Sequence, residues 1–344
     1  VSNCPAVRLT GIGTIRLPKR FKNVITVRFA PSPTGYMHIG NLRTALLNYL
    51  YALSAKKTTG EDFTFVLRMD DTDTERSKPE YEQAVYEDMR WLGIPWDRLE
   101  HQSKRLDRYN RVLEDFKRRG LVYACYETAE ELEYKRRRQR ARGLPPVYDR
   151  AGLKLTAEDR AKLESDGRRP HYRFKLEHRE VSWDDMVRGH CSYNGAHLSD
   201  PIVVREDGTF PYMLPSVIDD ADFAVTHVIR GEDHVTNTAV QIQMFEALGT
   251  KPPVFGHPPL LTGREGKLSK RLGSLSSREL REQGVEPMTI ACLLARLGTS
   301  DPVVVCHGWE ELAGHFDLTR FGRAQPHFDT GDLFKLNPRV VRSM

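Results

Sequence analysis

No aspartate or glutamate precedes Glu61, although arginine and lysine recur throughout that first segment. The sequence also lacks an apolar run of about 18 residues, so it predicts no membrane-spanning helix. Its five cysteines are scattered and include no Cys-x-x-Cys pair, which argues against a secreted disulfide framework. We therefore expect a reduced, cytoplasmic protein that binds no membrane.

Internal repeats and low-complexity tracts are absent too, so no repeat array is indicated. A chain of 344 residues is long enough for roughly two or three domains. The net charge of +5 permits a polyanionic partner but does not require one. Residues 1–23 are basic and lack the apolar core of a secretory signal. We interpret them as an N-terminal extension, with a short targeting segment as the alternative.

The stretch from Val27 to Asn41 predicts a buried strand, a tight turn rich in proline and glycine, and the start of a helix. Apolar residues at three- and four-residue spacing after Asn41 give that helix one core-facing side. Turns of this kind hold phosphates because free backbone N–H groups and the helix dipole point at them. This turn has neither the Rossmann GxGxxG pattern nor a Walker lysine, and it carries His38-Ile39-Gly40 instead.

Strands and helices alternate until about Leu121, with a strand predicted over 63–69 and a helix over 80–92. The alternation returns near Phe223, with strands predicted over 223–230 and 254–261. Between these points charged helices mix with short strand-like pieces such as 171–176. The acidic run 70–73 follows a predicted strand, at the edge where doubly wound sheets bind ligands. We expect an α/β fold in which an α+β insertion splits one parallel sheet. The expected boundaries are 24–105 and 211–265 for the two halves of the catalytic domain, 106–210 for the insertion, and 266–344 for a mostly helical end.

Two separated motifs resemble the signatures of class I aminoacyl-tRNA synthetases. His38-Ile39-Gly40-Asn41 is similar to their HIGH motif, and Lys267-Leu268-Ser269-Lys270-Arg271 resembles their KMSKS loop. Two lysines in a loop are usually only solvated charge, but here both motifs occur in the family's order around an insertion. The resemblance covers essentially 27–344 and implies the Rossmann-like class I fold with a stem-contact domain at the end. Within the class, the segments similar to glutamyl-tRNA synthetases are 28–35, 68–73, 227–234 and 293–298.

This resemblance implies that glutamate and ATP form glutamyl-adenylate, and that glutamate is then transferred to the 3′-terminal ribose of tRNA-Glu. Attack on the α-phosphate builds negative charge, which fixed donors and cations must offset. His38 can donate from its imidazole, and Lys267 and Lys270 can close over the leaving pyrophosphate, so these three are the candidate catalytic residues. Mg²⁺ is expected with the ATP. The implied ATP-binding residues are Pro33, Thr34, Gly35, His38, Gly40, Asn41, Lys267, Leu268, Ser269, Lys270 and Arg271.

A glutamate substrate carries two carboxylates and one ammonium, so its site needs two cationic partners and one anion. Arg28 and Arg230 are candidates for the carboxylates, although each is equally consistent with a strand-end ion pair. Asp70 is the candidate for the ammonium group. The resemblance adds Ala30, Ser32, Tyr212 and Ser216 to the pocket. The chain departs from the family at Asp70 and Ser216, where glutamate and asparagine are common.

The family's insertion sometimes carries a zinc site that begins near a Cys-Tyr-Cys sequence. The matching stretch here contains only Cys125, and no cysteine follows near residues 148–150. Because structural zinc takes four ligands, we expect no zinc. The basic run nearby is either a solvated helix face or a surface for tRNA acceptor-stem phosphates. The candidate tRNA-binding residues are Lys135, Arg136, Arg137, Arg138, Arg140 and Arg142.

Two alternatives to a glutamate–tRNA ligase stay open. The first is a glutamyl-queuosine tRNA synthetase, a shorter relative that modifies a tRNA base. The segment 316–337, which resembles the stem-contact part of full synthetases, favours the ligase. The second is a tRNA-binding paralogue without catalysis, against which the intact His38, Gly40, Lys267 and Lys270 argue. Full synthetases continue past the position of Met344 into an anticodon-binding domain, so charging of tRNA-Gln also stays open. We expect a monomer.

Overall fold

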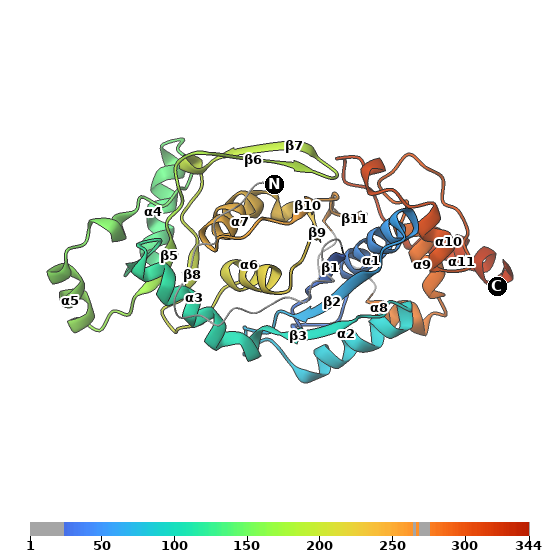
Figure 1. Ribbon diagram of the computed structural model, residues 1–344, viewed down its shortest axis with the longest axis horizontal. Coiled ribbons are helices and arrows are strands. Elements are labelled where there is room, and N and C mark those ends of the chain that lie inside the picture. The colour runs from blue at the N-terminus through green and yellow to red at the C-terminus, as the bar shows by residue number, and fades with distance from the viewer. Residues whose placement is uncertain (1–23, 264–265, 268–275, 344) are drawn as a thin grey trace, which may run out of the picture.

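The structure is a computed structural model, and it describes residues 24–263, 266–267 and 276–343. The predicted extension 1–23 and Leu268, Ser269, Lys270 and Arg271 of the lysine motif lie outside these residues. The molecule is elongated, with the middle of the chain at one end and the C-terminal helices at the other (Figure 1).

The sheet at the centre is parallel and is built from two distant parts of the chain. Strands β1 (Ile25–Phe29), β2 (Phe63–Met69) and β3 (Arg98–His101) pair in the order β1-β2-β3, while β9 (His227–Ile229) pairs with β10 (Val254–Gly256). The Thr226 amide donates to the Thr26 carbonyl at 2.9 Å, which sets β9 beside β1. The predicted split sheet is therefore confirmed, and its carboxyl edge combines both halves.

Helix α1 (Ile39–Thr59) is the core of the catalytic part. It carries no acidic residue, and Leu42, Ala45, Leu46 and Leu50 have no exposed surface. A helix that is apolar on nearly all sides is stable only when other elements surround it. Here it packs against β1 and β2 and against the C-terminal helix α9 (Pro287–Leu294) in one hydrophobic cluster. The other helices of this part are α2 (Pro79–Leu92), α6 (Met213–Asp222) and α7 (Val235–Ala247), with the short helices η1 (Gln102–Arg105) and η4 (Glu232–His234).

The insertion contains a second, antiparallel sheet, as the mixed pattern of its sequence predicts. Its strands are β4 (Val122–Cys125), β5 (His171–Phe174) and β8 (Ile202–Val204). A long hairpin of β6 (Glu180–Asp185) and β7 (Gly189–Asn194) returns along α7 to β10 (Figure 1). The Met186 amide after β6 donates to the Phe255 carbonyl of β10 at 2.9 Å. The helices here are α3 (Leu106–Arg118), α4 (Ala129–Ala141), α5 (Ala157–Ser165), η2 (Ala151–Lys154) and η3 (Gly195–His197).

The end of the chain is mostly helical and shares the core of α1, because Leu280, Ile290 and Leu333 belong to the same cluster. No helix in the described parts of the chain has the length and apolar character that a membrane span requires. The elements are β11 (Thr262–Gly263), β12 (Gly266–Lys267), α8 (Ser277–Glu282), α9 (Pro287–Leu294), α10 (Trp309–Gly314), η5 (Leu318–Arg320) and α11 (Thr330–Ser343).

Two predicted strands are shorter in the structure. The strand predicted over 223–230 is reduced to β9, because Phe223 caps α6 and Ala224 has a positive φ of 53°. The strand predicted over 254–261 ends at Gly256, since Pro258 and Pro259 have no backbone N–H to donate to a neighbour. Apolar composition alone does not reveal these ends.

Candidate active site

The carboxyl ends of β1, β2 and β9 border a cleft of about 440 Å³. This edge is where open α/β sheets bind ligands. Most of the residues expected to bind glutamate or ATP line this one cleft. They are Arg28, Ala30, Ser32, Asp70, Tyr212 and Arg230 from the first set, and Thr34, Gly35, His38, Gly40 and Asn41 from the second.

His38 caps the first turn of α1. Its ring Nδ1 accepts from the Gly40 backbone N–H at 3.1 Å, and its backbone N–H donates to Asn41 Oδ1 at 3.2 Å. In the neutral imidazole this places the proton on Nε2, so that nitrogen is a donor. A Cβ on Gly40 would lie 3.0 Å from His38 Cε1, so glycine lets the ring pack against the turn. The cap observed at His38 and the phosphate-donor role expected of it therefore use different ring nitrogens.

The described residues on both sides of the lysine motif lie near this turn or near the cleft. The backbone of Lys267 in β12 pairs with that of Thr262 in β11, which follows the cleft residue Leu260 by two positions. On the other side, Ser276 forms a β-bridge with His38, and the Ser277 amide donates to the Met37 carbonyl at 3.1 Å. Ser276 and Ser277, the first described residues after the motif, thus lie beside the candidate phosphate donor.

Arg230 is a buried cation, and its hydrogen-bond partners among the described residues are neutral. Its guanidinium donates to the Tyr212 hydroxyl at 2.8 Å, to Thr238 Oγ1 at 2.7 Å and to His257 Nε2 at 3.3 Å. Within the described part of the chain, no carboxylate lies at ion-pair distance from it. Burial lowers the pKa of Arg230. A buried charge without a counter-ion is costly, so this position favours an anionic ligand.

Arg28 lies in the same cleft and forms one ion pair among the described residues, from Nε to Asp220 at 3.3 Å. The positive charges of both arginines act on the Tyr212 hydroxyl. Burial acts to raise the pKa of its hydroxyl, but the charges of Arg230 and Arg28 outweigh it and lower the pKa. The cleft thus contains two cationic groups from the two halves of the sheet.

Asp70 and Ser216, the two departures from the family pattern, contact the same side chain. Arg68 donates to Asp70 Oδ1 at 2.6 Å and Oδ2 at 3.1 Å, and to Ser216 Oγ at 3.2 Å. A further bond of 2.8 Å joins Arg68 to Asp220. Asp70 reaches the cleft, whereas Ser216 lies behind it and does not line it. Pro33 does not line it either.

The sequence did not single out Arg68, Asp219 or Asp220. Arg68 could have been identified from the sequence, because it precedes Asp70 by two residues and residues two apart on a strand share a face. Asp219 is buried and receives bonds from Gln102, Arg105 and Tyr109, which lie more than a hundred residues earlier. No local pattern predicts such a partnership.

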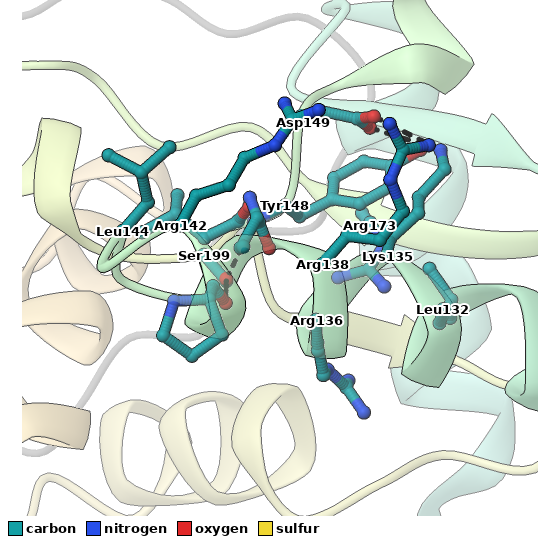
Figure 2. A pocket seen from close by; sticks show the side chains of 13 residues that line it. Leu132, Lys135, Arg136, Arg138, Arg142, Leu144, Tyr148, Asp149, Arg173 and Ser199 are labelled. Carbon is teal, nitrogen blue, oxygen red and sulfur yellow. Dashed lines mark hydrogen bonds and ion pairs between the residues drawn. The ribbon is translucent and has the colours of Figure 1, made fainter.

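The basic run of the insertion is divided by the structure. Four of its residues line a cavity of about 230 Å³ beside α4, together with the buried Arg173 and Tyr148 (Figure 2). Arg137 and Arg140 do not line it, and both pair with Glu133, at 3.5 and 3.4 Å. The four lining residues are Lys135, Arg136, Arg138 and Arg142.

Three metal-ligand types meet on β4 and β5. The ligand atoms of Cys125, Glu127 and His171 lie within 4.8 Å of one another, because Cys125 pairs with His171 across the two strands. Of these three, only Cys125 was identified from the sequence as a possible metal ligand. His171 Nε2 and Glu127 Oε2 have no hydrogen-bond partner among the described residues. Tyr148, however, donates to Glu127 at 2.9 Å, and Lys135 lies 3.2 Å from the same carboxylate.

The donor set matches structural zinc poorly. A structural site takes four ligands, and this cluster offers three. Burial raises the pKa of the Cys125 thiol to about 11, so a metal would have to displace a tightly held proton from it. The Lys135 ammonium lies 3.2 Å from Glu127 Oε1 and already gives this carboxylate a positive partner.

Residues 24–333 match the family described as tRNA synthetases class I (E and Q), catalytic domain. Glutamate–tRNA ligase 1 of Rhodospirillum rubrum is 53% identical over 321 residues, which are 93% of this chain and 71% of the relative. Glutamate–tRNA ligase 1 of Maricaulis maris is 54% identical over 92% of this chain and 71% of the relative. The crystal structure of an Elizabethkingia meningosepticum glutamate tRNA ligase in complex with its amino acid has a TM-score of 0.81 at 31% identity, covering 94% of this chain and 70% of that one.

Proposed function

The chain belongs to the class I tRNA synthetases for glutamate and glutamine, and we propose from this premise that it is a glutamate–tRNA ligase. It activates glutamate with ATP and transfers the amino acid to tRNA, with tRNA-Glu as the proposed substrate. The relatives at 53% and 54% identity carry the name of this activity. The fold agrees, because the parallel sheet and its insertion match solved glutamate tRNA ligases.

The observation that carries the choice of amino acid is the pair of buried arginines in one cleft. Arg230 has only neutral protein partners among the described residues, and Arg28 has a single ion pair through Nε. Guanidinium groups bind carboxylates through two parallel N–H donors. Each arginine therefore takes one carboxylate of glutamate, and Tyr212 is near enough to both for their charges to lower its pKa.

Asp70 is the anion proposed for the substrate ammonium group. Its two oxygens accept from Arg68, and each retains acceptor capacity toward the cleft. Ser216 contributes indirectly, because its hydroxyl accepts from Arg68 behind the cleft. Ala30 and Ser32 complete the wall.

The start of α1 is the proposed phosphate site. His38 Nε2 is a donor, and the first turn of the helix contains no acidic residue that would repel a phosphate. As the carboxylate attacks, negative charge grows on the α-phosphate oxygens, and fixed donors here stabilise it. Lys267 and Lys270 are proposed to offset the charge of pyrophosphate. Mg²⁺ would come with ATP, since it binds mainly through phosphate oxygens and water.

The acceptor end of the tRNA is proposed to contact the basic cavity of the insertion. Arg138 and Arg142 line it and have no ion-pair partner within the described residues. Phosphate contacts of this kind add affinity without reading bases. We also propose that the cluster at Cys125 holds no zinc, and that the protein acts as a cytoplasmic monomer.

ATP–pyrophosphate exchange with glutamate, measured with and without tRNA-Glu, tests the function. A ligase of this type exchanges label when glutamate and its tRNA are both present. Exchange with glutamate in the absence of any tRNA favours the glutamyl-queuosine tRNA synthetase. Absence of exchange under every condition, with a correctly folded protein, leaves a tRNA-binding protein without catalysis. Whether tRNA-Gln is charged is decided by replacing tRNA-Glu with tRNA-Gln in the same assay.

A further inference from the structure

A row of buried polar groups runs from Arg230 to the β6–β7 hairpin of the insertion. Arg230 Nε donates to His257 Nε2 at 3.3 Å, and Thr238 Oγ1 lies 3.0 Å from the same nitrogen. On the other side of the ring, His257 Nδ1 bonds to Asp185 Oδ2. His257 has no exposed surface, and Asp185 is also buried. None of the sequence patterns joined these residues, which lie on three separate segments.

Asp185 has a fixed orientation because each of its oxygens has its own donors. Oδ1 accepts backbone N–H groups from Val187 and Arg188, both at 3.0 Å, and from His257 at 3.1 Å. Although burial acts in the opposite direction, the bonds from His257 and the backbone lower the pKa of Asp185 to about 2. The ionised carboxylate can only accept, so His257 Nδ1 must carry a proton.

The tautomer of His257 follows from this. Burial lowers the pKa of His257, which keeps the ring neutral. A neutral ring that is protonated on Nδ1 has a lone pair on Nε2, the nitrogen that faces Arg230 Nε. Since a guanidinium only donates, the opposite tautomer would set two N–H groups against each other.

Arg230 is held on three sides in this way. Nε is bound by His257, Nη2 by Thr238 and Nη1 by Tyr212. The described residues thus bind one N–H group on each nitrogen. The second N–H groups of Nη1 and Nη2 can form the fork that binds a carboxylate through two bonds. Arg230 lines the cleft, so the fork is available to a ligand there.

We propose that Asp185 and His257 are positioning residues for glutamate recognition. Asp185 holds His257 in the Nδ1–H tautomer, and His257 orients the guanidinium of Arg230 toward a substrate carboxylate. The inference rests on the proposed role of Arg230 in glutamate binding. It also gives the insertion a part in the amino-acid site, because Asp185 ends strand β6, which runs beside β10 (Figure 1).

Asp185→Asn tests the tautomer. Three backbone N–H groups donate to Oδ1 of Asp185, and the single side-chain oxygen of asparagine takes over this position. The NH₂ group of asparagine then faces His257 Nδ1. The ring proton then moves to Nε2. Thr238 adapts, because its hydroxyl has a second acceptor in the His234 carbonyl at 3.2 Å. Arg230 Nε can only donate, so it loses its bond to the His257 ring. We therefore expect the KM for glutamate to rise about tenfold.

His257→Gln and His257→Asn form a matched pair. The glutamine amide reaches the position of Nε2 and supplies an oxygen to Arg230, whereas the shorter asparagine reaches only the position of Nδ1. We expect the KM for glutamate to stay within about threefold of the parent value in the Gln variant, and to rise about tenfold in the Asn variant. The KM for ATP is expected to stay unchanged in all three variants.

The measurements are initial rates of exchange with tRNA-Glu present, together with Tm for each variant of the full chain. An Asp185→Asn variant with the parent KM for glutamate overturns the inference. It is also overturned if glutamate and ATP constants rise together, or if Gln and Asn at position 257 behave alike, because both results indicate a purely structural role. If the parent protein shows no exchange with glutamate, the proposed function fails, and the inference fails with it.

Discussion

Arg68 donates two hydrogen bonds to Asp70, from Nε to Oδ1 at 2.6 Å and from Nη2 to Oδ2 at 3.1 Å. The pair is buried, and Asp70 nevertheless borders the cleft. The same guanidinium binds Ser216 Oγ at 3.2 Å. The shorter acid at position 70 and the hydroxyl at 216 therefore belong to one arrangement, in which Arg68 holds the acidic side of the amino-acid site.

The protonation of Asp70 predicts a pH dependence of glutamate binding. Burial raises the pKa of Asp70 to about 6, and Arg68 only partly offsets this. Below that pH the carboxyl is neutral and attracts an ammonium group poorly, so the KM for glutamate should fall as pH rises through about 6. Exchange assays from about pH 5.5 to 7.5 check this, with the KM for ATP as the internal control. A flat glutamate profile across this range contradicts the assignment.

The same shift has the opposite sign for stability. The folded-state pKa of Asp70 lies above the ordinary value of 3.8, so the folded protein binds the proton more tightly than the unfolded chain. The contribution of this group to the free energy of unfolding thus falls as pH rises from about 4 to 6. Binding and stability respond in opposite directions in adjoining ranges, and Asp70→Asn should weaken both dependences.

Much of the fold follows from local sequence. Strand β2 has the predicted bounds, Phe63–Met69, because an apolar run is bounded by polar residues on both sides. Helix α2 differs from its prediction by one residue, since Pro79 starts it and Gly93 ends it. The insertion was recognisable because the alternation of strands and helices stops and resumes. Short strands such as β10 were overestimated, because apolar character continues past the last residue that pairs.

The candidate site was predictable only in part. Arg28 and Arg230 follow from charges that end buried strands, and His38 from its motif. The partners that fix these groups, such as Asp220 and His257, come from distant segments that tertiary packing brings together. Their types also occur throughout the surface, so charge alone does not single them out. What the sequence predicts are the groups facing a ligand, and what it omits are the groups that hold them.

His38→Asn separates the capping role from the phosphate role. Asparagine is a good N-cap residue, so the free energy of unfolding should change by less than about 1 kcal/mol. The variant lacks the Nε2 donor, and loss of one such donor typically slows the chemical step by roughly 10²–10³-fold. Stopped-flow or exchange rates together with thermal unfolding check both. A variant with parental activity would show that His38 acts only as the cap of α1.

Gly40→Ala tests the proposed phosphate site at the same turn, because the added methyl group displaces the His38 ring. The new Cβ would lie 3.0 Å from His38 Cε1 and 3.1 Å from Nδ1, so the ring must move. We expect a lower kcat for activation while the KM for glutamate stays near the parent value, since Arg28 and Arg230 are untouched. An increase in the glutamate KM alone is inconsistent with a phosphate site at this turn.

Removal of metal should leave the insertion unchanged. Structural zinc contributes roughly 10–16 kcal/mol in small zinc domains, so its loss would be plain in thermal unfolding. We expect purified protein to contain no stoichiometric zinc and to keep its Tm after treatment with a strong chelator. Stoichiometric zinc with a lower Tm after chelation would instead make Cys125, Glu127 and His171 its ligands. The metal would then bind His171 Nε2 and Glu127 Oε2, which have no hydrogen-bond partner in the described part of the chain.

Two arginine pairs near the end of α4 allow a test of whether tRNA binds in the basic cavity or only responds to the general positive charge. Arg138 and Arg142 line the cavity (Figure 2). Arg137 and Arg140 do not line it, and both pair with Glu133. Replacing both members of either pair by alanine removes the same formal charge from nearly the same place. If tRNA phosphates lie in the cavity, Arg138→Ala with Arg142→Ala should raise the KM for tRNA and reduce the slope of log KM against log salt by about 1 to 2. Arg137→Ala with Arg140→Ala should change the slope by less than half as much. Equal effects of the two pairs would mean that the helix attracts tRNA only through its overall charge, and the cavity would then have no assigned ligand.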